Sequence, residues 1–173
     1  MKAESRLAAL LGAALCAASL AASEQASPQP AAKGKTMTMQ AKGTFEVKVK
    51  PLAEDEKVSG VKVGRMSIDK GWAGDIVGTS QGEMMASGGP VKGSGGYVAI
   101  EEMKVSLKGR RGTFTLMHHA TMKNNTDFRM LINVVPDSGT GELAGLEGVL
   151  TIVIEGSKHS YTFDYTLPDQ KWR

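Results

Sequence analysis

The sequence predicts an all-β fold, a single antiparallel β-barrel of about eight strands. Apolar and polar residues alternate with period two along most apolar segments, which is typical of half-buried strands. The 173 residues include 21 glycines, and no long segment has the apolar spacing of an amphipathic helix. About eight antiparallel strands can hide their edges in a sandwich or in a closed barrel. We favour the barrel, which at this size holds side chains or one small ligand.

Residues 1–38 are expected to precede the barrel as an export signal and a spacer. Lys2 and Arg6 are followed by an apolar run at 7–18 that is too short to span a membrane, and small residues at 21–23 would permit cleavage. The next segment is rich in Pro, Ala and Gln without apolar periodicity, as flexible spacers are. We therefore expect a periplasmic or secreted protein without an integral membrane segment after cleavage. Its parts would be a signal peptide at 1–23, a disordered spacer at 24–38 and the barrel at 39–168.

Cys16 is the single cysteine, and it falls within the predicted signal. A lipoprotein signal has a small residue before its cysteine, whereas Leu15 stands there, so the sequence argues against a lipid anchor. If Cys16 leaves with the signal, the remaining chain has no thiolate for a disulfide, a nucleophile or a metal site.

The first three strands are expected at residues 43–50, 61–69 and 71–85. A bulge near Gly64 would explain why the apolar positions of the second strand change phase. In the third strand, glycines at 74, 78 and 82 share one face, which indicates strong coiling or the close approach of another layer. Trp72, near the start of this strand, is expected at the rim of the barrel.

The clearest hairpin spans residues 95–122. Each of its two strands has a mostly apolar face, interrupted by Glu101 in the first strand and by His118 in the second. With a turn near Gly109–Gly112, residue 103 would pair with residue 118. Glu101 would then lie diagonal to His118, within reach of its side chain.

The last three strands are expected at residues 126–135, 148–155 and 160–167. Pro136 ends the first of them, because proline cannot donate a hydrogen bond to a ladder. The second is apolar on both faces and should therefore be covered on both sides. The glycosylation-like triplet at 124–126, just before these strands, is interpreted as a turn.

Five motifs in this order suggest a family. They are GTFEVK, GDIVGTSQGEMM, GSGGYVAIEE, LKGRRGTFTLMHHATM and VVPDSGTGELAGLEG. Together they resemble the mostly bacterial family called domain of unknown function 3224, over residues 39–167. The resemblance implies a barrel similar to that of allene oxide cyclase, but no activity, because the family has none established. The similarity to the cyclases is at fold level only, and fold does not imply function.

The charges and histidines exclude some classes of function. The net charge is only +3 and the Lys and Arg residues are scattered, so we expect no nucleic-acid partner. His118 and His119 are adjacent and must face opposite sides of a regular strand, so they cannot bind one metal ion together. We expect neither a metal nor a cofactor.

Glu101 and His118 are the candidate catalytic residues. If both apolar faces of the hairpin turn inward, burial would raise the pKa of the carboxyl group and the neighbouring imidazole could exchange protons with it. The alternative is a hydrogen-bonded interior pair that only fixes the register of the strands.

Six further residues are candidates for ligand binding. Five are aromatic and would line a cavity or simply pack in the core. Glu83 would be a second inward carboxylate, or an outward one in water; the alternation favours the outward position. The six candidates are Tyr97, Glu83, Phe114, Phe128, Tyr161 and Tyr165.

Three functions remain open. The barrel could bind a small hydrophobic or amphipathic ligand, with Glu101 and His118 as polar anchors. It could instead be a cofactor-independent isomerase or cyclase that uses the same two residues. Finally, it could be a filled barrel that acts through its surface or as a homo-oligomer.

Overall fold

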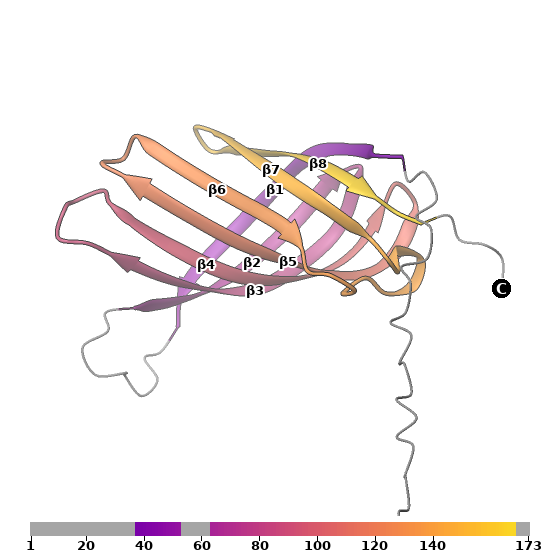
Figure 1. Cartoon of the computed structure of the whole chain (residues 1–173), viewed down its shortest axis with the longest axis horizontal. Coiled ribbons are helices and arrows are strands. Elements are labelled where there is room, and N and C mark those ends of the chain that lie inside the picture. The colour runs from indigo at the N-terminus through magenta and orange to yellow at the C-terminus, as the bar shows by residue number, and fades with distance from the viewer. Residues whose placement is uncertain (1–36, 53–62, 169–173) are drawn as a thin grey trace, which may run out of the picture. The chain divides into compact units, whose positions relative to one another are not determined.

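A computed structural model describes residues 37–52 and 63–168, which form a closed antiparallel barrel of eight strands. Neighbours in sequence are neighbours in the wall, and β1 pairs with β8 to close it (Figure 1). The predicted fold class is therefore confirmed. The expected signal peptide, Cys16 and the spacer up to residue 36 lie outside the described residues.

The eight strands follow one another along the chain. Their bounds are β1 (Met39–Pro51), β2 (Gly64–Gly74), β3 (Ile76–Gly88), β4 (Gly95–Leu107), β5 (Arg110–Lys123), β6 (Asp127–Val134), β7 (Glu147–Glu155) and β8 (Lys158–Thr166). A short 3-10 helix, η1 (Gly141–Leu143), lies between β6 and β7. Within the described ranges, no helix is long and apolar enough to cross a membrane.

The two ends of the barrel differ in how well they are filled. One end carries the turns after β2 and β4 and the η1 segment; we call it the closed end. Its core is buried and includes Leu143 in η1 and Leu146 shortly after η1. At the other end, which we call the open end, the inward-facing Phe128 and Ile154 are about half exposed. The interior is therefore packed at the closed end and accessible at the open end.

The β4–β5 turn lies at Lys108 and Gly109, so the predicted turn at 109–112 was wrong. Both residues have a positive φ, 47° and 88°, as the two central residues of a tight hairpin turn require. Residue 103 consequently pairs with Phe114 and not with residue 118. Gly112 lies within β5, where a Cβ would sit 2.1 Å from the carbonyl oxygen of Thr140. Residue 112 is therefore a glycine because the backbone of Thr140 lies against it, and it is not part of the turn.

The prediction of a single strand at 71–85 was wrong, because these residues belong to two strands. β2 continues to Gly74, which has a φ of 108°, and β3 begins at Ile76. Asp75 makes the turn, and its carboxylate accepts a hydrogen bond from the backbone N–H of Lys42 at 2.9 Å. Trp72 is therefore in the interior, with 4% of its surface exposed, and not at the rim. The predicted phase change near Gly64 coincides with the start of β2, and residues 53–62 lie outside the described residues.

Two predictions about the second half have different outcomes. The turn at 124–126 is confirmed, and both of its asparagines have a positive φ. The prediction that β7 is covered on both faces was wrong, because Val149 and Val153 on its outer face are nearly half exposed. β7 pairs along its length with β8, but with β6 only at Asn133 and Val149.

We expect Gly82→Ala to destabilise the barrel, because a Cβ at Gly82 would lie 2.3 Å from the carbonyl oxygen of Ile100 and 2.8 Å from Cα of Glu101. Both atoms belong to backbone that cannot move freely, so the expected cost is about 1–3 kcal/mol in urea unfolding. Gly71→Ala is the matched control, because a Cβ there meets nothing within 4 Å. Equal losses in both variants would contradict this account.

Candidate functional site

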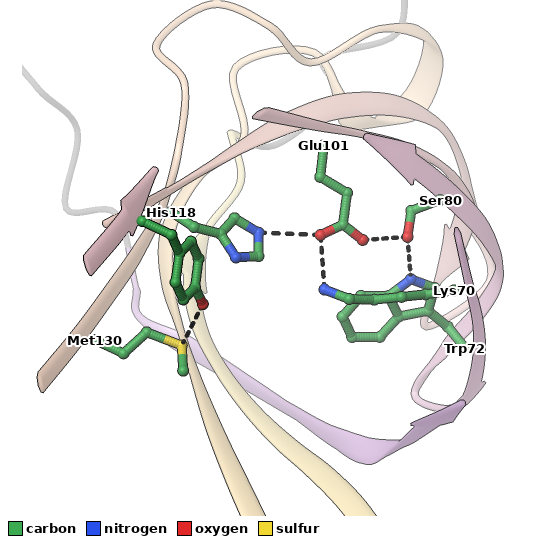
Figure 2. A network of polar contacts seen from close by, with 7 residues as sticks. Lys70, Trp72, Ser80, Glu101, His118 and Met130 are labelled. Atoms are coloured by element: carbon green, nitrogen blue, oxygen red, sulfur yellow. Dashed lines mark hydrogen bonds and ion pairs between the residues drawn. The ribbon is translucent and has the colours of Figure 1, made fainter. Parts of the chain in front are cut away.

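A network of polar side chains lies inside the barrel around Glu101, which is 0% exposed (Figure 2). Lys70 on β2 places Nζ 2.7 Å from Oε2 of Glu101. Ser80 on β3 donates a hydrogen bond from its hydroxyl to Oε1. The indole Nε1 of Trp72 in turn donates to Oγ of Ser80 at 2.7 Å. Both carboxylate oxygens are therefore occupied by partners from other strands.

His118 on β5 completes the network. Its Nε2 lies 3.0 Å from Oε2 of Glu101, and its side chain is 3% exposed. The ladder pairs His118 with Ala99, so that Glu101 is its diagonal neighbour. Nε2 makes no hydrogen bond of good geometry, so the contact with Oε2 is close but poorly directed. The structure thus brings together the two residues that the sequence predicted to meet.

The partners of Glu101 reverse the pKa shift that burial would cause. Burial favours the neutral acid and would raise the pKa, as the sequence led us to expect. The contacts with His118, Lys70 and Ser80 favour the carboxylate and lower the pKa from 4.5 to about 2. The expectation of a raised pKa was therefore wrong. A group with this pKa is ionised at neutral pH and is a weak proton acceptor there.

Aromatic rings enclose the ammonium group of Lys70. Its Nζ lies 5.0 Å from the ring centroid of Phe45 and 5.3 Å from that of Trp72. A cation close to aromatic faces is attracted by the ring quadrupole, and the attraction is stronger away from water. Phe45 and Trp72 also contact each other, with centroids 4.8 Å apart. The rings therefore replace part of the water that the buried ammonium has lost.

A pocket of about 440 Å³ lies at the open end, and neither Glu101 nor His118 lines it. Met84, Tyr97 and Ala120 line it, and each lies two to four residues along its strand from Ser80, Glu101 or His118. Tyr97 reaches across Ala120, and its hydroxyl lies 3.9 Å from Sδ of Met130. Burial, with a smaller effect from the charge of Glu101, raises the pKa of Tyr97. The other lining residues are Ala86, Ser87, Gly88, Gly93, Ser94, Gly95, Gly96, Thr121, Met122 and Phe128.

The sequence of residues 41–165 matches the family described as protein of unknown function (DUF3224). The chain belongs to this family. It is similar to a crystal structure of a protein with unknown function from the DUF3224 family of Shewanella oneidensis MR-1, with 42% identity and a TM-score of 0.69. The match covers 76% of this chain and 98% of that one. Among curated proteins, none matches the chain.

The other predicted ligand-binding residues of this DUF3224 barrel are divided among three places. Tyr97 and Phe128 line the pocket. Phe114, Tyr161 and Tyr165 are buried in the hydrophobic core and do not line it. Glu83 lies on the outer face, as the alternation favoured, and a hydrogen bond from Arg65 lowers its pKa there, so Glu83 does not line the pocket.

Three residues of the network escaped the sequence reasoning: Lys70, Trp72 and Ser80. For Lys70 and Trp72 the reason is that the predicted strands end and begin on either side of residue 70, which is in the middle of β2. If that strand is continued to Gly74, Ile68, Lys70 and Trp72 alternate onto the inner face, and Lys70 becomes a polar residue on an apolar face. In residues 37–52 and 63–168, no three His, Cys, Asp or Glu side chains gather closely enough to hold a metal ion.

We expect Glu101→Gln to lower the free energy of unfolding by about 3–5 kcal/mol at neutral pH, because it leaves the buried ammonium of Lys70 without its counter-charge. Glu102→Gln is the matched control. Glu102 faces outward and its ion pair with Lys104, at 3.4 Å, is exposed, so its loss should cost no more than about 1 kcal/mol. Similar losses in the two variants, measured by urea unfolding, would contradict the role given to the buried pair.

The stability supplied by Glu101 should depend on pH. Its pKa is lower in the folded protein than its ordinary value of 4.5, so the unfolded chain binds more protons as pH falls between 4.5 and about 2. The contribution is complete above about pH 5 and is lost toward pH 2, with a total of roughly 3 kcal/mol. The stability difference between the wild type and Glu101→Gln should shrink by this amount from pH 6 to pH 2. A constant difference would show that Glu101 titrates normally.

Proposed function

We propose that the barrel binds a small, mostly apolar molecule in the pocket at its open end. The observation that carries this proposal is the uneven filling of the barrel, which is packed at the closed end and has a pocket of about 440 Å³ at the open end. Pockets of roughly 300–1,000 Å³ with apolar walls and a few fixed polar groups are typical of small-molecule sites.

The side chains of the pocket support an apolar ligand with some freedom of shape. Met84 and Met122 are unbranched and polarisable, so they can adapt to ligands of different outline. Tyr97 and Phe128 offer aromatic surface to the same space. Gly88, Gly93, Gly95 and Gly96 lie in or next to the β3–β4 connection, and they line the pocket without adding a side chain to it.

Tyr97 supplies the polar contact of the proposed site. The contact of its hydroxyl with the sulfur of Met130, at 3.9 Å, is weak, so the hydroxyl can turn to an oxygen or nitrogen of a ligand. Glu101 and His118 do not line the pocket and lie four and two residues along their strands from Tyr97 and Ala120. Because the charges of Glu101 and Lys70 offset each other, this ion pair adds no net charge to the interior, which favours a ligand with an uncharged polar group.

A cofactor-independent isomerase or cyclase with Glu101 as general base has weaker support. General bases work best with a pKa near the working pH, whereas the partners of Glu101 hold its pKa at about 2.

The export-like segment at 1–23 supports placing the binding function outside the cytoplasm.

The neutral fluorescent probe N-phenyl-1-naphthylamine should bind the wild type and become brighter in the apolar pocket. Met84→Trp should weaken its binding at least about 10-fold, because the larger ring occupies the pocket. Met85→Trp is the matched control, since Met85 is the next residue of β3 and faces outward.

Circular dichroism and thermal unfolding of both variants would show that the fold is kept. Equal weakening of probe binding by both substitutions, or no binding to the wild type, would contradict the proposed site. Native mass spectrometry of the purified protein would then identify any ligand that it retains.

A further inference from the structure

Apolar side chains gather on the outer side of β3 to β6, where His119 interrupts one of their rows. In the ladders, Met85 pairs with Val98 and Ile100 pairs with Met117. Leu131 extends the first of these rows, from which it is separated by His119. These five apolar side chains point outward and are 44–52% exposed. We call Met85, Val98, Ile100, Met117 and Leu131 the β4–β5 face.

The size of the β4–β5 face suits a protein interface. Its five half-exposed side chains offer roughly 400 Å² of apolar surface in two adjacent rows, whereas isolated exposed apolar residues need no explanation. A standard interface buries about 800 Å² on each partner and has an apolar centre with a polar rim. The face is therefore large enough for such a centre.

The charges around the face indicate what kind of partner it fits. Glu102 and Lys104 form an ion pair at 3.4 Å, and Asp127 and Arg129 form one at 3.2 Å. Both pairs lie on β4 or β6, which carry the face, and each pair is neutral within one copy. Two identical rims can therefore meet without net repulsion. An anionic membrane surface would instead favour an excess of Lys and Arg.

We propose that the β4–β5 face is the interface of a symmetric homodimer. Two sheets pack face to face about 10 Å apart when both inner faces are apolar, and a second copy supplies the same apolar rows. In a twofold dimer the same patch is used on both subunits, as a face with a neutral rim allows. The face is outside the barrel wall and the pocket is inside it, so dimer formation is independent of ligand binding.

Sedimentation equilibrium of the full chain, from micromolar to submillimolar concentration, tests the proposal. The wild type should be a dimer that dissociates on dilution. Ile100→Lys combined with Met117→Lys places like charges at the centre of the face and should raise the dissociation constant at least about 100-fold. The matched control is Val77→Lys combined with Val153→Lys. It adds the same charge at positions that are 57% and 49% exposed and lie outside the face.

Methyl-labelled methionine makes the interface visible by NMR. The signals of Met85 and Met117 should shift on dilution, over the same range in which the mass falls. Met103 is fully buried in the core, so its signal should stay constant. A monomeric wild type, or equal dissociation by both double variants, would overturn the proposal. The proposal would also fail if the wild type stayed monomeric and bound phosphatidylcholine vesicles, and the double variant Ile100→Lys with Met117→Lys did not bind them. The face would then be a lipid-binding surface.

Discussion

The ion pair of Glu101 and Lys70 inside the barrel constrains much of the structure around it. Removing two charges from water is costly, and their mutual attraction compensates only if the remaining hydrogen-bonding positions are also filled. Ser80 donates a hydrogen bond to the carboxylate, Nε2 of His118 lies 3.0 Å from it, and two aromatic rings lie close to the ammonium. These groups come from β1 to β5, and a shift of one residue in any of the four ladders would turn a partner outward. The polarity of the interior and the register of half the wall therefore depend on each other.

The fold could be predicted from the sequence because alternation is a local signal. Its period identifies strands, and the number of strands limits the ways in which they can close. Turn positions were harder to predict, because a glycine has more than one use. Gly109 provides a positive φ, whereas Gly112 admits the backbone of Thr140. Only the three-dimensional contacts distinguish these two roles.

The site was predictable where a polar residue interrupts an apolar face, as Glu101 and His118 do. Lys70 follows the same rule, but its strand has to be drawn to its true end before the rule applies. The direction of the Glu101 pKa shift could not be predicted, because it depends on partners from other strands. The sequence also did not show which end of the barrel would be open. Leu143 and Leu146, in the connection between β6 and β7, fill the closed end, and a local pattern does not show where such a connection folds.

The single ladder pair between β6 and β7 has a mechanical consequence. Along the remaining seams, seven to thirteen residue pairs hold each strand to its neighbour, and the wall is in effect one eight-stranded sheet rolled until β6 and β7 meet. Spreading β6 from β7 costs very few backbone hydrogen bonds, whereas opening any other seam costs an entire ladder. The seam between β6 and β7 is therefore the weakest part of the barrel wall. Separation of these two strands would widen the interior at the open end, while the strands that hold Glu101 and its partners keep their register.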